Sequence, residues 1–584
     1  MLSAVDAGDA AALLAAVPAG RRVALVDPRF VGHVHALRLG LTDPRFAAAT
    51  VPGALTAQPE ARGALLRALH RTTAAVGAGA PVVDPETDPA PEDRTVPGRI
   101  AVALEAEGTA VQRPALGSLV ATVPTDAGQE AAAAAEVAAV DDEAVRLRSA
   151  VKAHDGFFTT FCISPYSRYI ARWCARRNLT PNQVTTASLI TALIAAGSAA
   201  TGTRGGYIAA GILLLVSFVL DCTDGQLARY SLQYSTMGAW LDATFDRAKE
   251  YAYYAGLAIG AVRGGDDVWV LALGAMVLQA CRHVVDFSFN EANHDAVANT
   301  SPTAALSDKL DSVGWTVWAR RMIVLPIGER WAMIAVLTAF TTPRIVFYAL
   351  LVGCALAACY TTAGRLLRSL TRKASRTDRA AQALADLADS GPLAQGVAAV
   401  APGLRGAFTA PAVALLGTLV MVGAALLLPY GSWLTVAAAA VYVVLSGLAV
   451  ARPLKGALDW LVPPFLRAAE YVTILVLAAR SDVPHAVPAA FGLVSAVAYH
   501  HYDTVYRIRG GTGAPPQWLV RTIGGHEGRT ALVAVLAAVL THASGFTTAL
   551  TALAVAVALV VLVESIRFWV SSSAPAVHDE GELA

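Results

Sequence analysis

Two short stretches decide the fold and the chemistry expected of this chain. They are Asp221-Cys-Thr-Asp224-Gly225-Gln-Leu-Ala228-Arg229 and, eight residues later, Gly238-Ala-Trp-Leu-Asp242-Ala-Thr-Phe-Asp246. An apolar run leads into the first stretch, and another leads out of the second. Each charge placed at membrane depth costs about 2.5 to 3.5 kcal/mol on the insertion scale. Four carboxylates at the junction of two membrane helices therefore need a function that offsets this cost.

The spacing of the acids predicts a metal site. Asp221 and Asp224 are three residues apart, and Asp242 and Asp246 are four apart, so each pair projects from one face of a helix. If the two helices lie side by side, the four acids converge, and like charges at that range cannot all stay ionised without cations. Hard oxygen ligands prefer Mg²⁺ or Mn²⁺.

The residues between the acids favour a phosphate-containing substrate. Gly225 and Gly238 leave space beside the carboxylates, and Ala228 keeps one helix face flat. Arg229 offers a planar fork that suits phosphate oxygens. Together with a metal, these features predict a pyrophosphate site. Capping or salt-bridging at a helix boundary is the simpler explanation for any single acid, but a poor one for eight positions at fixed spacing.

The composition is that of a membrane protein. Of the 584 residues, 55% are hydrophobic and only 15% are charged. The formal net charge of +1 argues against a nucleic-acid partner, which needs a basic surplus gathered on one face. The six cysteines have no zinc-like spacing and are expected to be buried apolar side chains. Since no signal peptide pattern opens the chain, we expect the N-terminus in the cytosol.

We expect an all-α polytopic membrane protein with a small α/β soluble domain at its N-terminus. Six apolar stretches predict a first helix bundle, at 183–202, 205–222, 238–262, 267–290, 330–342 and 344–364. A second bundle of five or six membrane helices is expected at 407–428, 432–451, 457–479, 485–500, 530–543 and 546–568. The expected domains are therefore 1–150, 151–370, a cytosolic linker at 371–405, and 406–584.

Local patterns refine this division. In the N-terminal domain, residues 23–27, 99–104 and 119–123 are expected as strands and 129–151 as helix. No glycine-rich phosphate loop occurs there, and its role is not evident. Residues 155–178 mix aromatic side chains with arginines, which is typical of a helix in the lipid headgroup layer; a helix packed on the soluble domain is the alternative. Basic residues gather in the loops that an internal N-terminus would place in the cytosol, as the positive-inside rule requires.

The acidic motif also carries a resemblance. Its pattern, DxxDGxxAR, eight residues and GxxxDxxxD, resembles that of the CDP-alcohol phosphatidyltransferase family without departure, over roughly residues 155–370. Thr180-Pro-Asn182-Gln-Val-Thr185 is similar to the family's entry motif, and six membrane helices are its usual catalytic domain. The resemblance implies transfer of a phosphoalcohol group, expected to be phosphatidyl, from a CDP-linked lipid such as CDP-diacylglycerol to the hydroxyl of a polar alcohol, releasing CMP in phospholipid biosynthesis.

The same resemblance implies roles for individual residues. Asp221, Asp224 and Asp242 would bind one Mg²⁺ or Mn²⁺ ion, and Asp221, Asp242 and Asp246 a second. Asp246 would also be the catalytic general base. The CDP portion would contact Asn182, Thr185, Gly225, Arg229 and Ser235, with Ala228 and Gly238 beside it. The family resemblance further suggests a homodimer in the cell membrane, with the active site at the cytosolic ends of its helices.

Several alternatives stay open. The acceptor could be inositol phosphate or glycerol phosphate, with Arg282, His283, Lys309, Arg320 and Arg321 as candidate cations, although loop cations more often bind lipid headgroups. A polytopic transporter or a catalytically inactive scaffold relative is the alternative to an enzyme. In the second bundle, Arg467, Glu470 and the run His500-His501-Tyr502-Asp503 form either a second surface for phosphate or lipid headgroups, or a partner to the first site; His and Asp there could also ligate metal. The alternative is a basic cytosolic loop, with Arg467 and Glu470 paired inside the bundle.

Overall fold

The computed structural model describes residues 7–18, 21–42, 47–77, 95–152, 155–233, 235–294, 323–371, 376–401, 403, 406, 408–541 and 544–571. Lys309, Arg320 and Arg321, named above as candidate cations, lie outside these residues. The chain divides into two compact units: the first comprises 1–153, 166–181 and 223–238, and the second 154–165, 182–222 and 239–584.

A small α/β fold forms most of the first unit, as predicted. Its sheet has the order β1 (Val23–Val26), β4 (Ala54–Ala57), β3 (Ala48–Val51) and β5 (Val111–Gln112), antiparallel except between β3 and β5. Strands β3 and β4 are buried along their whole length. The remaining elements are α1 (Ala7–Ala16), β2 (Val31–Gly32), α2 (Val34–Thr42), the short 3₁₀ turn Pro59–Ala61, α3 (Arg62–Gly77), α4 (Val96–Ala106), β6 (Ala121–Thr122), α5 (Ala127–Ala139) and α6 (Asp142–Ser149).

One of the local predictions in this region is wrong, and another is confirmed. The strand predicted at 99–104 is part of helix α4, because Thr95 caps the helix by accepting a hydrogen bond from Gly98 N at 3.1 Å and Pro97 stands in its first turn. The helical structure predicted at 129–151 is confirmed: it consists of α5 and α6, and Asp141 caps α6 by accepting a hydrogen bond from Ala144 N at 3.0 Å. The strands predicted at 23–27 and 119–123 correspond to β1 and β6.

The aromatic and arginine-rich stretch is helical, with a π-helical turn at Thr159–Ile163 followed by α7 (Ser164–Arg176). Phe161 and Trp173 expose about half of their surface, at 53% and 52%. Exposed rings on an arginine-rich helix suit the membrane boundary. Not every arginine is available to lipid phosphates, since Arg172 and Arg176 both pair with Glu143 of α6.

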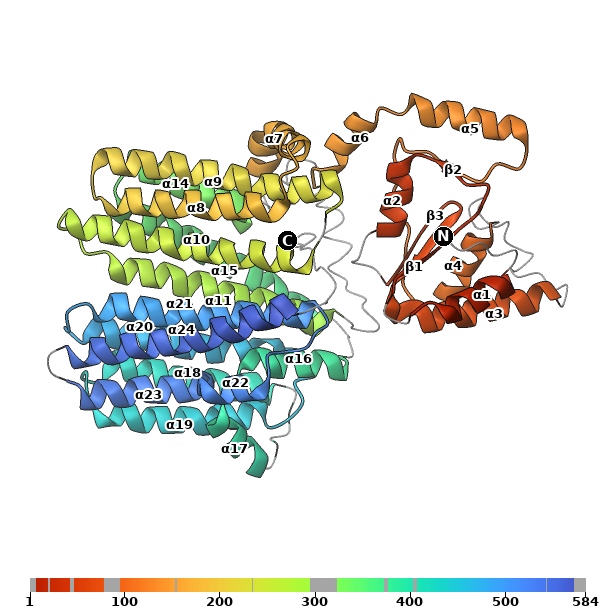
Figure 1. The fold of residues 1–584 in the computed structure, drawn as a ribbon. Coiled ribbons are helices and arrows are strands. Elements are labelled where there is room, and N and C mark those ends of the chain that lie inside the picture. Colours follow the sequence, from red (N-terminus) through yellow and green to blue (C-terminus); the bar gives the residue numbers. More distant parts are fainter. Residues whose placement is uncertain are drawn as a thin grey trace. The chain divides into compact units, whose positions relative to one another are not determined.

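Twelve helices of 14 to 29 residues follow in the described part of the chain, with shorter helices between some of them. The first six are α8 (Pro181–Ala200), α9 (Arg204–Ser231), α10 (Thr236–Arg263), α11 (Trp269–Asn293), α14 (Ile327–Phe340) and α15 (Pro343–Thr371). After α16 (Asp378–Ala388) and α17 (Pro392–Val400) come α18 (Thr409–Leu427), α19 (Trp433–Val450), the short turn Asp459–Leu461, α20 (Val462–Arg480), α21 (Ala486–Arg509), the short α22 (Gln517–Thr522), α23 (Gly525–Val539) and α24 (Gly545–Ser571). Figure 1 shows these helices running alongside one another in the second unit.

Eight of the described helices are long and apolar enough to cross a membrane: α8, α9, α11, α15, α18, α19, α20 with the turn before it, and α24. The predicted all-α polytopic membrane fold is confirmed. Helix α10 has the length but is not among the eight; it carries Asp242, Asp246, Arg247, Lys249 and Glu250 within three turns. Helices α14 and α23 are only 14 and 15 residues long.

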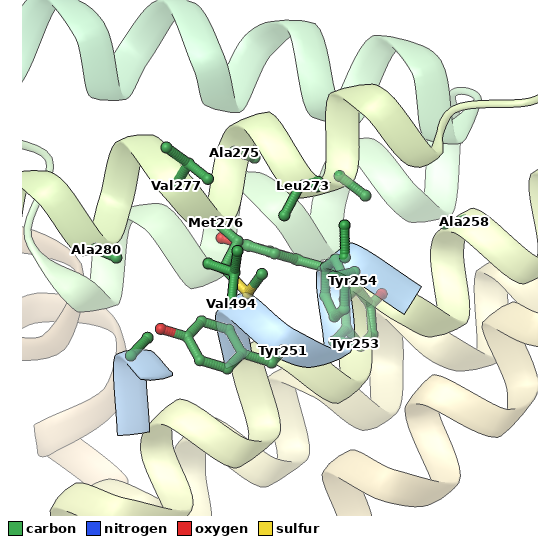
Figure 2. Close-up of a cluster of buried hydrophobic side chains, with 14 of the residues drawn as sticks. Tyr251, Tyr253, Tyr254, Ala258, Leu273, Ala275, Met276, Val277, Ala280 and Val494 are labelled. Atoms are coloured by element: carbon green, nitrogen blue, oxygen red, sulfur yellow. The ribbon is translucent and has the colours of Figure 1, made fainter. Parts of the chain in front are cut away.

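The hydrophobic core of the second unit is continuous across both groups of helices. Helix α11 packs against α15 of its own group and against α20 and α21 of the later group. Figure 2 shows Met276 of α11 with Tyr251 of α10 and Val494 of α21 in the shared cluster. The two predicted bundles are therefore joined by a common apolar interface.

Glycines bring α10 close to α8. A Cβ atom at Gly256 would lie 2.3 Å from the carbonyl oxygen of Ala196, and one at Gly260 would lie 2.0 Å from that of Ala199. Small residues at such contacts allow membrane helices to pack backbone to backbone. This contact fixes the distance between α8 and the helix that carries Asp242 and Asp246.

We predict that Gly256→Ala lowers the thermal unfolding midpoint in detergent. The added methyl must push α8 and α10 apart, and overpacking of this kind costs about 1 to 3 kcal/mol. Gly197→Ala on α8 is the matched control, because nothing lies within 4 Å of its Cβ position. Equal midpoints for the two variants would contradict the close contact.

Candidate active site

Three carboxylates meet where α9 and α10 face each other. Asp221 comes from α9, and Asp242 and Asp246 come from one face of α10; one oxygen of each lies within 4.8 Å of the other two. The side chains of Asp221 and Asp246 are 14% and 16% exposed, whereas Asp242 is open to its surroundings. The site is thus buried on one side and accessible on the other.

A buried lysine that the sequence analysis did not single out completes this group. Lys249 is 1% exposed, and its Nζ contacts Asp221 Oδ1 directly, lies 2.8 Å from Asp246 Oδ1 and donates to Ser188 Oγ at 3.2 Å. Its position three residues after Asp246 places it on the same face of α10. That spacing was readable in the sequence. Its ammonium group partly neutralises two closely spaced acids.

The group of carboxylates fits a hard divalent cation. All of its donors are oxygens, and Asp246 Oδ1 is buried, with the Lys249 ammonium 2.8 Å away. Such a donor set suits Mg²⁺ or Mn²⁺. Among the residues that the structure describes, this is the one set of three or more acidic, His or Cys side chains placed to hold a metal ion.

Asp224 is not part of the three-carboxylate group. It lies one turn beyond Asp221 on α9 and is buried. Close by in the sequence, the Arg229 guanidinium lies against Gly225, where a Cβ atom would be 3.5 Å from Nη1, and Arg229 Nε donates to the carbonyl oxygen of Ala150 at 2.6 Å. Gly225 therefore makes room for Arg229, whose ε-nitrogen binds the backbone of the segment that leads into the membrane region.

The other residues assigned to the CDP portion, except Ala228, lie at helix starts. Asn182 and Thr185 are in the first turns of α8, with Thr185 buried. Ser235 precedes α10 and accepts a hydrogen bond from Gly238 N at 2.9 Å, which is the geometry of an N-cap. Ala228 is buried on α9. Ser235 thus has a structural role besides the predicted one.

Glu250 anchors the helix that carries the site. It is fully buried and accepts from Arg247 at 2.9 Å, from Arg330 of α14 at 3.3 Å and from Tyr254 Oη at 2.6 Å. A buried carboxylate is tolerated only when it is paired and hydrogen-bonded in this way. These bonds fix the rotation of α10 and therefore the direction of Asp242 and Asp246.

The charged side chains buried among the later helices form a network in which arginines and carboxylates neutralise one another. Arg467 lies 3.1 Å from Glu470 and 3.0 Å from Asp389, and Arg529 lies 2.5 Å from Glu470 and 2.8 Å from Asp389. Burial opposes ionisation of Asp389, but the two arginines lower the pKa of its carboxyl well below the ordinary value. Of the alternatives left open by the sequence, the pairing of Arg467 with Glu470 inside the bundle is the one observed.

Two families match different parts of the chain. The model of the family described as CDP-alcohol phosphatidyltransferase matches residues 178–359, which include all four acids of the motif. This region, which is less than half of the chain, is therefore similar to that family. Residues 378–584, which include the buried network around Asp389, match a family of unknown function, DUF5941.

Three curated relatives resemble part of the chain. The chain is 31% identical over 113 residues to the archaetidylinositol phosphate synthase of Pyrococcus horikoshii, covering 19% of this chain and 58% of that protein. It is 30% identical over 131 residues to the phosphatidylinositol phosphate synthase of Streptomyces avermitilis, covering 22% and 51%. It is 32% identical over 123 residues to the bifunctional IPC transferase and DIPP synthase of Aquifex aeolicus, covering 20% and 27%. The chain thus spans less than two thirds of each of these proteins.

We predict that Arg529→Met strongly destabilises the protein. Removing this guanidinium leaves Glu470 and Asp389 with one arginine between them, and breaking a buried ion pair costs about 3 to 5 kcal/mol. The measurement is the thermal unfolding midpoint in detergent, with Arg521→Met, at an exposed position of α22, as the control. A midpoint unchanged by Arg529→Met would mean that the network does not hold these helices together.

Proposed function

We propose that the chain transfers a phosphatidyl group from a CDP-linked lipid to the hydroxyl of a polar alcohol and releases CMP. The observation that carries the proposal is the convergence of Asp221, Asp242 and Asp246 within the region similar to the CDP-alcohol phosphatidyltransferase family. A membrane location suits a lipid donor, and the exposed Asp242 suits a water-soluble nucleotide.

The proposed cofactor is a pair of Mg²⁺ or Mn²⁺ ions. Asp221, Asp224 and Asp242 would hold one ion, and Asp221, Asp242 and Asp246 the other. When bound, such ions supply positive charge that offsets the charge of the pyrophosphate and of the departing CMP. The fit is better for the second set, whose three oxygens already lie within 4.8 Å of one another.

The protein's own residues would bind the donor and move one proton. Asn182, Thr185, Gly225, Ala228, Arg229, Ser235 and Gly238 would line the CDP portion. The acceptor oxygen would form a bond to the lipid-side phosphorus as the bond from that phosphorus to the CMP oxygen breaks. Asp246 would take the hydroxyl proton, and CMP would leave with the bonding electron pair.

An inositol phosphate or glycerol phosphate acceptor is part of the proposal. The names of the Pyrococcus and Streptomyces relatives favour an inositol phosphate among the acceptors to test. Purified protein should be incubated with CDP-diacylglycerol, Mg²⁺ and a panel of alcohols, and the lipid product identified by its mass. Metal-dependent CMP release with one acceptor supports the enzyme; no release with any of them favours a transporter or an inactive scaffold.

We also propose how the chain is oriented in the membrane, and that it forms a homodimer. The proposed domains are 1–150, 151–370, 371–405 and 406–584. The active site and the N-terminus would be cytosolic. This orientation is supported by the positive-inside pattern of the sequence. The loops that it places outside carry few cations, Arg204, Arg263 and Arg344, and Arg344 is paired to Asp266.

Asp246→Asn is predicted to reduce CMP release by about 10²- to 10⁴-fold, the usual contribution of a general base. The amide cannot accept the proton, and it is a weaker ligand for a hard cation. Asp378→Asn is the matched control, because its side chain is 95% exposed on α16. An Asp246→Asn variant with full activity would rule out the assigned role.

Lys249→Met is predicted to tighten Mn²⁺ binding at least tenfold. The substitution removes a positive charge that lies 2.8 Å from Asp246 and competes with a cation for the same carboxylates. Electron paramagnetic resonance of Mn²⁺ titrated into the purified protein measures the affinity, with Lys455→Met as the control for loss of an exposed lysine. Weaker binding in the Lys249 variant would mean that the lysine organises the carboxylates for the metal.

A further inference from the structure

Helix α10 has two opposite faces with different neighbours. At about 100° per residue, Asp242, Asp246 and Lys249 point to one side of the helix. Trp240, Arg247 and Tyr251 fall within about 40° of one another on the other side. The carboxylate side faces Asp221 of α9. The opposite side meets residues that come from the region matching the family of unknown function.

Two aromatic side chains of that region cover the opposite face. The Trp569 ring of α24 stacks on Trp240 with centroids 6.0 Å apart and an angle of 19° between the planes. The Tyr502 ring of α21 lies under the Arg247 guanidinium, 5.3 Å from its carbon. Trp240, Trp569 and Tyr502 are all buried. Stacked rings and a desolvated cation–π pair each contribute about 0.5 to 2 kcal/mol.

Both aromatic side chains are held by hydrogen bonds. Asp503 Oδ1 accepts from Trp569 Nε1 and from Ser565 Oγ, each at 2.7 Å, and Asp503 also pairs with Arg507 at 2.8 Å. Tyr502 Oη bonds His283 Nδ1 of α11. Because Asp503 fixes the indole, Trp569 presents one ring orientation to α10.

Helix α21 is itself aligned along α11. Contacts occur at successive levels: Trp269 with Phe491 at 5.6 Å, Met276 Sδ with Ser495 Oγ at 3.3 Å, His283 with Tyr502, and Glu291 with Arg509 at 3.9 Å. In Figure 2, Val494 of this helix lies with Met276 and Tyr251. The later helices thus approach the region similar to the phosphatidyltransferase family along a whole helix and reach α10 from it.

We propose that the C-terminal region positions the catalytic helix, with Trp569 and Tyr502 as positioning residues that act on Asp242 and Asp246 through Trp240 and Arg247. This role rests on the proposed function of the carboxylates. Trp240 precedes Asp242 by two residues and Arg247 follows Asp246 directly, so the two contacts bracket both acids. A rotation of α10 would move the acids away from Asp221, and the two contacts resist that rotation.

A double-mutant cycle on the full chain tests this positioning role. The proteins are wild type, Trp240→Ala, Trp569→Ala and the double variant, and each is assayed for kcat and KM in CMP release and for Mn²⁺ affinity by paramagnetic resonance. We expect each single variant to lose at least tenfold in kcat and in Mn²⁺ affinity with KM for the donor within twofold. The double variant should be no worse than the more impaired single variant, because the two changes remove one contact.

Two further variants separate positioning from general damage. Trp569→Phe keeps a ring over Trp240 and should recover most of kcat, which also keeps the test valid if the alanine variant does not fold. Trp433→Ala removes an indole that is 64% exposed on α19 and should leave kcat and Mn²⁺ affinity unchanged. Additive effects in the cycle, or equal losses in Trp433→Ala, would overturn the proposal. If the wild-type protein binds Mn²⁺ but releases no CMP, the proposed transfer reaction alone is refuted. The double-mutant cycle measured by Mn²⁺ affinity still tests whether Trp569 positions the carboxylates of α10.

Discussion

The cost of keeping several carboxylates on two largely apolar helices constrains the rest of this structure. Asp221, Asp242 and Asp246 lie within 4.8 Å of one another, and without compensation their mutual repulsion would separate α9 from α10. Lys249 supplies one internal positive charge. A metal ion bound by the same oxygens, as proposed, would supply more and would stabilise the folded site.

The helices around the site keep the acids close in spite of that repulsion. Glycine contacts hold α10 against α8, and the bonds of Glu250 to Arg247, Arg330 and Tyr254 fix its rotation. On its far side, α10 is covered by Trp569 and Tyr502. Preorganised charge of this kind is the usual source of electrostatic catalysis, because the protein does not reorganise during the reaction. In this account, the C-terminal helices hold α10, and with it the carboxylates, in a fixed orientation.

Local patterns in the sequence predicted the helices and the acids well. The i, i+4 spacing placed Asp242 and Asp246 on one face of α10, which meets Asp221 of α9, whereas Asp224 is outside that group. The buried pair of Arg467 with Glu470 was one of the alternatives that the sequence left open. The error at residues 99–104 arose because a short apolar run fits a strand as well as a helix, and the cap at Thr95 decided between them. Lys249 was overlooked because it lies outside the acidic motif. Its spacing of three residues from Asp246 nevertheless placed it on the same face of the helix.

Sequence patterns did not predict the contacts between distant parts of the chain. The stacking of Trp569 on Trp240 joins residues more than three hundred positions apart, as their numbers show, and no periodicity relates them. The same holds for Asp389, whose two arginine partners come from α20 and α23. Such contacts depend on how the two helix groups pack against each other. The hydrophobic pattern does not determine this packing, because an apolar helix face can contact lipid as well as another helix.

The most direct test of the central claim is ³¹P relaxation of CDP-diacylglycerol bound to the Mn²⁺-loaded protein. If the acidic group holds the metal against the donor's pyrophosphate, both phosphorus signals should broaden strongly, and a chelator should restore them. Signals that stay sharp while Mn²⁺ is bound to the protein would contradict the account, because the metal would then lie away from the bond that is proposed to break.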